Sequence, residues 1–192
     1  VKVGVKGGRG HTIGRDCPLT PLTYRPSMPP MSPDELRHQL IRNFNEQPRE
    51  RSVRPPLYDS ESASLTAGTV ATKLGAAIDV VAPGQMSCPY HSHYAQEEMF
   101  IILEGEGTLR VAGERVPVRA GDVITIPPGP EYPHHLINTS SAPLKYLSIS
   151  TQERPEVCEY PDSGKVGAFP GPGGARFIQR RGNELDYWDG EP

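Results

Sequence analysis

The chain has 192 residues, a formal net charge of −3 and a sequence isoelectric point of about 6.1. This length suits one domain with a long arm. The slightly acidic balance, without a dense Lys/Arg cluster, argues against nucleic acid as a partner. No run approaches the roughly 20 apolar residues of a membrane span, and three widely spaced cysteines argue against a disulfide framework. We therefore expect a soluble, cytoplasmic protein that binds neither membrane nor nucleic acid.

The first part of the chain is expected to contribute little to the hydrophobic core. Residues 1–31 are rich in Gly and Pro, and we expect a flexible arm or a segment that wraps a partner subunit. Residues 32–47 (SPDELRHQLIRNFNEQ) predict a short amphipathic helix with Ser32 as its N-cap. Its apolar stripe would consist of Leu36, Leu40 and Phe44. Residues 32–68 are accordingly expected to be a short helix and a linker.

From residue 69 the pattern changes to short apolar or alternating runs separated by Gly, Pro and Asn turns. The chain holds 20 Gly and 22 Pro, which favours short strands and many turns. Residues 69–151 therefore predict an antiparallel all-β sandwich or barrel of about eight strands. Ala112–Gly113 is expected to form a hairpin turn.

The C-terminal segment, 152–192, is expected to be a loop followed by a docked tail. Residues 152–176 have the composition of a loop. The tail carries Tyr187 beside Trp188, the single tryptophan of the chain. Because two adjacent large aromatic residues are costly to expose, we expect them to dock on the barrel or on a partner subunit.

Two of the six histidines lie in one tripeptide, within the stretch CPYHSHYAQEEMF at 88–100. The strand period of two places His91 and His93 on one side. A short turn over 94–97 interrupts the count, and Glu98 restarts it on the same face as Phe100 and Ile102. Two imidazoles and a carboxylate buried together are costly unless they are paired or bind a metal. A divalent metal would satisfy all three.

A further ligand would have to come from a distant strand. The stretch GDVITIPPGPEYPHHLIN at 121–138 provides two candidates, His134 and His135, at the start of a new strand. Residue type alone does not decide which of the two histidines is the ligand. The three residues between His134 and Asn138 favour His134 once a family pattern is considered.

These residues resemble the two motifs of the cupin superfamily. The first motif, G-x5-H-x-H-x(3,4)-E-x6-G, is matched by Gly84, His91, His93, Glu98 and Gly105, with six residues instead of five after Gly84. The second, G-x5-P-x-G-x2-H-x3-N, is matched by Gly121, Pro127, Gly129, His134 and Asn138, with four residues instead of two before the histidine. The resemblance covers about residues 70–150.

The resemblance implies a single jelly-roll barrel, the double-stranded β-helix of the cupins. It also implies one divalent transition metal per chain (Mn, Fe, Ni, Co or Zn) held by His91, His93, Glu98 and His134. Within the superfamily the chain is similar to single-domain cupins of the mannose-6-phosphate-isomerase-like type. The phrases EYPDSGK at 159–165 and DYWDGE at 186–191 resemble the tail of that group.

Two hypotheses on function follow. The first is a metal-dependent enzyme acting on a small polar metabolite, most favourably an isomerase of a sugar or sugar phosphate, with a dioxygenase or a lyase as alternatives. The second is a non-catalytic cupin that binds a small molecule through its metal.

Glu97 is either an acid/base group or a solvated turn residue. The expected pocket residues are Tyr90, Tyr94, Phe100, Ile102, Ile126, Tyr132 and His135. We expect a homodimer, because the N-terminal segments have too little apolar content to fold alone.

Overall fold

The structure, a computed structural model, describes residues 30–171, 173–182 and 184–191. The chain divides into two units, Val1–Ser32 and Pro33–Pro192, and every helix and strand of the described residues lies in the second. Most of the arm expected over residues 1–31 lies outside the described residues. None of the helices in the described ranges is long and apolar enough to cross a membrane.

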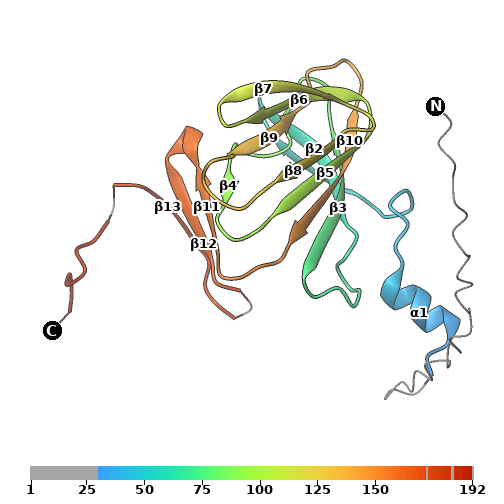
Figure 1. Cartoon of the computed structure of the whole chain (residues 1–192), viewed down its shortest axis with the longest axis horizontal. Coiled ribbons are helices and arrows are strands. Elements are labelled where there is room, and N and C mark those ends of the chain that lie inside the picture. Colours follow the sequence, from blue (N-terminus) through green and yellow to red (C-terminus); the bar gives the residue numbers. More distant parts are fainter. Residues whose placement is uncertain (1–29, 172, 183, 192) are drawn as a thin grey trace, which may run out of the picture. The chain divides into compact units, whose positions relative to one another are not determined.

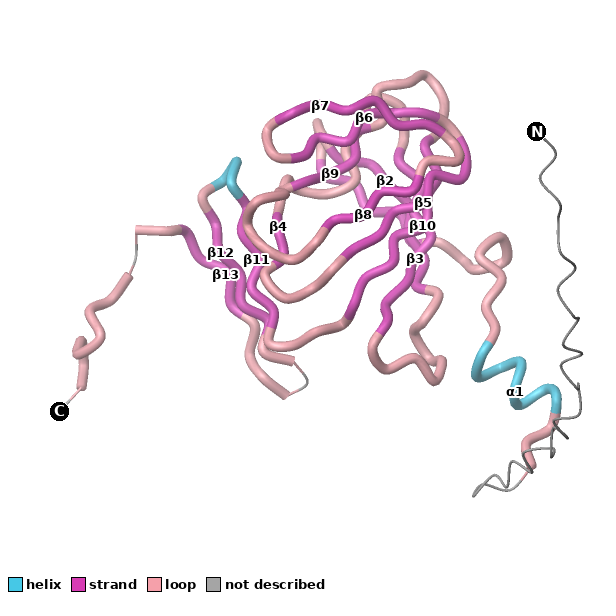
Figure 2. Tube along the Cα trace, in the orientation of Figure 1, coloured by secondary structure: helices cyan, strands magenta, loops and turns pink. Residues whose placement is uncertain are grey.

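The described residues form two short helices and thirteen strands (Figures 1 and 2). In chain order these elements are α1 (Pro33–Leu40), β1 (Glu50–Arg54), β2 (Tyr58–Ser64), β3 (Leu74–Val81), β4 (Ser92–His93), β5 (Glu98–Glu104), β6 (Glu106–Val111), β7 (Glu114–Arg119), β8 (Val123–Ile126), β9 (His134–Ile137), β10 (Leu144–Thr151), β11 (Glu156–Tyr160), the 3-10 helix η1 (Pro161–Ser163), β12 (Lys165–Phe169) and β13 (Phe177–Arg180).

The strands pair into three sheets, and all of the ladders between them are antiparallel. A six-stranded sheet has the order β1-β2-β3-β10-β5-β8, and a three-stranded sheet has the order β7-β6-β9. A four-stranded sheet, β13-β12-β11-β4, joins the end of the chain to β4 (Figure 1). The all-β jelly-roll architecture that the sequence predicts is thereby confirmed.

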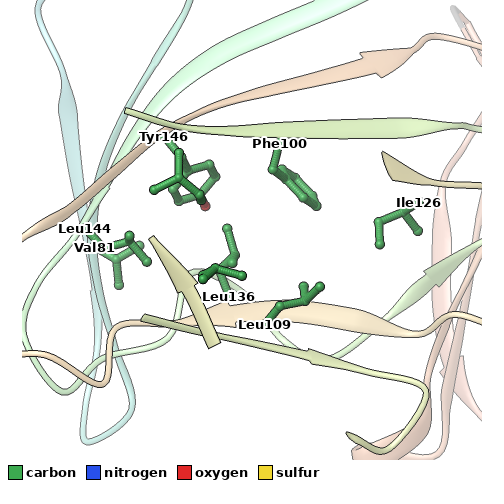
Figure 3. Packing of buried hydrophobic residues seen from close by; sticks show 9 residues of the cluster. Val81, Phe100, Leu109, Ile126, Leu136, Leu144 and Tyr146 are labelled. Carbon is green, nitrogen blue, oxygen red and sulfur yellow. The ribbon is translucent and has the colours of Figure 1, made fainter. Parts of the chain in front are cut away.

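The hydrophobic core lies between the six-stranded and the three-stranded sheet. Figure 3 shows side chains from the two layers pointing toward one another. Alternation along each strand explains why, since every second residue of β5 and of β6 faces inward. Burying a large apolar side chain contributes about 1.5–3 kcal/mol. The cluster consists of Val81, Phe100, Ile102, Leu109, Val118, Ile126, Leu136, Leu144 and Tyr146.

The predicted hairpin turn joins β6 to β7. Val111 pairs with Glu114, which leaves a two-residue loop. Ala112 and Gly113 both have positive φ, 49° and 85°, as a type I′ turn requires. Gly105 also has a positive φ, 84°, and a Cβ there would in addition lie 2.5 Å from the carbonyl oxygen of Pro143.

Two expectations about the flanks of the barrel were wrong. Residues 32–68 were expected to hold only a helix and a linker, but they also contribute β1 and β2 to the large sheet. Residues 152–176 were expected to be loop, but β11 and β12 lie there. All five residues of β1 are exposed, and β2 reads YDSESAS. Such polar strands lack the apolar alternation by which a strand is recognised in sequence.

The expected helix is shorter than predicted, and its apolar stripe is not covered. α1 ends at Leu40 and has no buried residue. Leu36 and Leu40 are 41% and 57% exposed. In the tail, Tyr187 and Trp188 pack edge to face but are 83% and 70% exposed, so the described chain does not bury them. Docking of either segment on a partner subunit stays a prediction.

Asn138, the last residue of the second motif, ties three backbone segments together. It is fully buried. Its Nδ2 donates to the carbonyl oxygens of Val81 and Ala142, each at 2.8 Å, and its Oδ1 accepts from the N–H and hydroxyl of Ser140. A buried amide that is satisfied on both ends fixes the turn after β9.

We expect Asn138→Ala to lower the free energy of unfolding by about 2–3 kcal/mol, because buried carbonyls lose their donors. Urea denaturation followed by circular dichroism measures this. Ser141→Ala, at an exposed position of the same turn, is the matched control and should change stability by less than about 0.5 kcal/mol. Equal midpoints for the two variants would contradict the structural role of Asn138.

Candidate metal centre

Four side chains that the sequence predicts as ligands meet between β4, β5 and β9. The Nε2 atoms of His91 and His93 lie 3.0 Å apart. The Nε2 of His134 lies 2.8 Å from Glu98 Oε2, and the Nε2 of His93 lies 3.6 Å from the same oxygen. The ligand atoms of His91, Glu98 and His134 all fall within 4.8 Å of one another. The structure therefore brings all four together.

The backbone sets this convergence. His91 and His134 lie opposite each other in an isolated antiparallel bridge and exchange two N–H···O bonds of 3.2 and 2.7 Å. His93 follows two residues after His91, so its side chain returns to the same face. Glu98 is the first residue of β5, after the turn over 94–97. The two-residue period of the strand, the turn over 94–97 and the bridge between His91 and His134 together place the four side chains around one point.

The carbonyl contacts of two of the rings indicate which nitrogen carries the proton when the ring is neutral. His91 Nδ1 lies 2.9 Å from the carbonyl oxygen of Pro89, and His134 Nδ1 lies 3.0 Å from that of Tyr132. A carbonyl oxygen can only accept, so in each neutral ring Nδ1 holds the proton and Nε2 holds a lone pair. Both lone pairs point into the centre, which already contains a carboxylate oxygen.

Burial and neighbouring groups lower the pKa of two of the four side chains, His93 and Glu98. Desolvation by burial lowers the pKa of His93, which favours its neutral form. Desolvation opposes the ionisation of Glu98, but its contact with His134 and the adjacent imidazoles together lower the pKa of this carboxyl. A neutral imidazole and an ionised carboxylate are the forms that bind metal ions.

His135 does not face this centre. Its Nδ1 lies 3.0 Å from the carbonyl oxygen of Cys88, and its ring packs edge-on against Tyr90 with centroids 5.4 Å apart. Burial lowers the pKa of His135. Its Nε2 is buried without a hydrogen-bond partner among the described residues. Of the two candidates left open by the sequence, His134 is the one that joins the cluster.

A second acidic residue, Glu156, supports the centre and was missed by the sequence analysis. It lies on β11, is 1% exposed, and has Oε1 3.7 Å from His93 Nδ1. Its Oε1 accepts the backbone N–H of Tyr94 and its Oε2 accepts that of Gln96, each at 2.9 Å. Glu156 thus holds the turn that connects His93 to Glu98.

Cys158 lies next to Glu156 on β11 and faces the same ring. Its Sγ is 3.4 Å from His93 Nδ1 and 3.9 Å from Glu156 Oε1. These three residues form a second group able to bind a metal through a sulfur ligand. Burial raises the pKa of the Cys158 thiol to about 12, and that of Cys88 to about 12 as well. Both thiols are therefore protonated and are poor nucleophiles.

A cavity of about 280 Å³ opens beside the imidazoles. The C-terminal sheet provides much of its wall. Its lining consists of Cys88, Pro89, His91, His93, Gln96, Arg154, Glu156, Cys158, Tyr160 and Phe169. A volume of this size accommodates a small metabolite.

The residues predicted for the pocket lie elsewhere. Tyr90, Phe100, Ile102 and Ile126 are buried in the hydrophobic interior, although Phe100 also packs on His134 with ring centroids 5.6 Å apart. Tyr94 and Tyr132 are 45% and 47% exposed. None of these, nor His135, lines the 280 Å³ cavity.

Glu97, the predicted acid/base residue, is exposed and does not line the cavity. Its backbone pairs with Thr151. The strand period places its side chain opposite Glu98. The cavity is lined by residues between 88 and 96 and by residues of β11, β12 and the segment before β11, more than 50 positions later in the chain.

Residues 77–150 match the sequence profile of the cupin domain family. This match identifies a cupin domain within the chain. This domain spans β3 to β10 and includes His91, His93, Glu98 and His134. The four-stranded sheet that closes the cavity is thus mostly an addition to the cupin domain.

Two curated relatives each match a segment of the chain. One is an uncharacterized protein of Methanocaldococcus jannaschii, 43% identical over 60 residues, which are 31% of this chain and 46% of that protein. The other is the oxalate-binding protein of Thermotoga maritima, 34% identical over 67 residues, which are 35% of this chain and 54% of that protein. This cupin therefore spans about half the length of the curated relatives it matches.

A solved structure with the same fold is a cupin-superfamily sugar phosphate isomerase from Silicibacter pomeroyi. It superposes with a TM-score of 0.65, covers 76% of this chain and 96% of that chain, and is 22% identical in sequence. At this identity the likeness establishes the fold and leaves the substrate open.

The contacts of Glu156 generate a prediction. Glu156→Gln should lower the free energy of unfolding by roughly 1–3 kcal/mol, because an amide can accept only one of the two backbone N–H groups and presents a donor to the other. Thermal unfolding of the metal-free protein measures this. Glu153→Gln removes the same charge from an exposed position and should be neutral. Equal unfolding temperatures for both variants would show that Glu156 does not hold the turn.

Proposed function

We propose that His91, His93, Glu98 and His134 hold one divalent transition metal ion. The observation that carries this proposal is the set of lone pairs at the centre. Two imidazole nitrogens whose protons are committed to carbonyl oxygens, and one carboxylate oxygen, lie within 4.8 Å of one another. Acceptors facing acceptors repel, and a cation relieves that repulsion. Three imidazoles and one carboxylate suit Mn, Fe, Co, Ni or Zn.

The 280 Å³ cavity beside the centre would receive a small, oxygen-rich metabolite. When bound, the metal would supply Lewis-acid polarisation of a ligand oxygen. Arg154 is the single Lys or Arg among the described residues that line the cavity, so a ligand with an anionic group is favoured. One relative is an oxalate-binding protein, and one protein with a similar fold is a sugar phosphate isomerase; both names refer to such molecules.

We favour an enzyme of the sugar phosphate isomerase type over a dioxygenase or a lyase. Isomerisation needs a group that moves a proton at carbon, within reach of the bound sugar. It also needs an acid that protonates the carbonyl oxygen of the sugar. Tyr160 would be that acid, because its phenol lines the cavity, its ring stacks on His91 with centroids 6.1 Å apart, and burial raises its pKa, so that it holds its proton. The base that takes the proton from carbon would have to be a different group.

A second candidate function, ligand binding without turnover, is favoured by a separate observation. Among the described residues, Glu156 is the one carboxylate of the cavity wall, and it is engaged by two backbone N–H groups. A free carboxylate base is therefore lacking at the wall.

Proton exchange distinguishes the two functions. An isomerase transfers deuterium from D₂O to the carbon beside the carbonyl of a sugar phosphate, observed by nuclear magnetic resonance, whereas a binding protein does not.

The metal proposal predicts a stoichiometry. Protein purified without added metal should contain about one equivalent of a transition metal by inductively coupled plasma mass spectrometry. His91→Ala, His93→Ala and His134→Ala should each weaken binding by at least about 100-fold, because each removes a ligand. Binding should also weaken as the pH falls, since the imidazoles must be neutral.

The matched control is His38→Ala, on the exposed face of α1, which should leave the metal content unchanged. His135→Ala is the sharper comparison, because that ring is adjacent in sequence but faces away from the centre. Loss of metal in His135→Ala with retention in His134→Ala would overturn the assignment. Circular dichroism of each variant shows whether it is folded.

A further inference from the structure

A second, larger hollow of about 770 Å³ lies beside the cavity. It runs between the segment around β2 and β3 and the start of the C-terminal sheet. We call it the arginine groove. Its lining consists of Ser64, Thr66, Ala67, Ala71, Thr72, Leu74, Gly75, Gln152, Arg154, Phe169, Pro170, Gly171, Gly174 and Arg176.

The arginine groove is selectively cationic. Among the described residues its lining includes two arginines, Arg154 and Arg176, and neither Asp nor Glu. Three hydroxyl side chains and the amide of Gln152 add further hydrogen-bonding groups.

Arg154 connects the groove to the cavity beside the metal centre. Arg154 and Phe169 line both hollows. The guanidinium NH1 lies 3.5 Å from the carbonyl oxygen of Phe169, a long contact. Arginine has five N–H donors in a planar fork that matches the oxygens of phosphate or carboxylate. An oxyanion in the groove can therefore be bound by Arg154 while the rest of the ligand reaches the cavity.

The backbone leaves room for a polar side chain on the floor of the groove. A Cβ at Gly75 would lie 2.3 Å from the amide nitrogen of Gln152, so glycine permits Gln152 to lie flat there. That nitrogen donates to the hydroxyl of Ser150 at 2.9 Å. The side-chain oxygen and the groove hydroxyls are of the kind that bind the hydroxyl groups of a sugar.

We propose that the arginine groove binds the phosphate group of a phosphorylated metabolite whose other end enters the 280 Å³ cavity, with Arg154 and Arg176 determining specificity. This inference rests on the proposed function and specifies its ligand. A ligand of the size of oxalate would occupy the cavity alone. A sugar phosphate has one end rich in hydroxyl and carbonyl oxygens and one dianionic end, which fits two adjoining hollows with a guanidinium at their junction.

The test compares ribose 5-phosphate, ribose and inorganic phosphate, at constant ionic strength, by isothermal titration calorimetry on the full metal-loaded chain. We expect ribose 5-phosphate to bind more tightly than either of the others. Arg154→Ala and Arg176→Ala should each weaken binding of ribose 5-phosphate by roughly 10- to 100-fold. Arg154→Lys should recover part of the loss, since it keeps the charge without the fork.

Arg115→Ala, at an exposed position of β7 outside both hollows, is the matched control and should bind like the wild type. The metal content of every variant is measured in parallel. Unchanged binding of the phosphates in the Arg154 and Arg176 variants, or no binding of either phosphate by a fully metallated chain, would overturn the arginine groove while leaving the metal centre intact. A chain that takes up no metal would instead contradict the proposed function.

Discussion

Repulsion among like acceptor atoms is the constraint around which this cupin is organised. The lone pairs of His91 and His134 and the carboxylate of Glu98 face one another within a few ångströms, and the carbonyl oxygens of Pro89 and Tyr132 fix the tautomers that cause this. We propose that a bound cation offsets this repulsion. The hydrophobic layer between the two sheets keeps these strands in register, and the register determines where the three imidazoles point.

The C-terminal sheet provides part of the wall of the cavity beside this centre. β11 pairs with β4 and brings Glu156 against the turn between His93 and Glu98. The same strand places Cys158 and Tyr160 on the cavity wall, and Arg154 just before it joins the cavity to the arginine groove. The cupin domain would thus provide the metal ligands, and the added strands would select the metabolite.

The spacing of His91 and His93 by one strand period predicts that they face one side, and the structure brings them together with Glu98 and His134. The Ala112–Gly113 turn is likewise predicted by its local sequence. The choice of His134 over His135 depends on a family pattern, and the steric requirement at Gly105 comes from the distant Pro143. Glu156 escapes prediction because its partners lie 60 and 62 positions away and its strand was read as loop. The polar strand β2 escapes for a related reason, since its place in the sheet comes from pairing with β3 and not from apolar alternation.

X-ray absorption spectroscopy of the metal bound to the purified chain tests the central claim most directly, because it distinguishes the two groups of potential ligands. Binding by His91, His93, Glu98 and His134 predicts a first shell of nitrogen and oxygen at about 2.0–2.2 Å, with the outer-shell scattering of imidazole. A sulfur neighbour at about 2.3 Å would instead place the metal on Cys158 with His93 and Glu156. That result would contradict the account given for the centre.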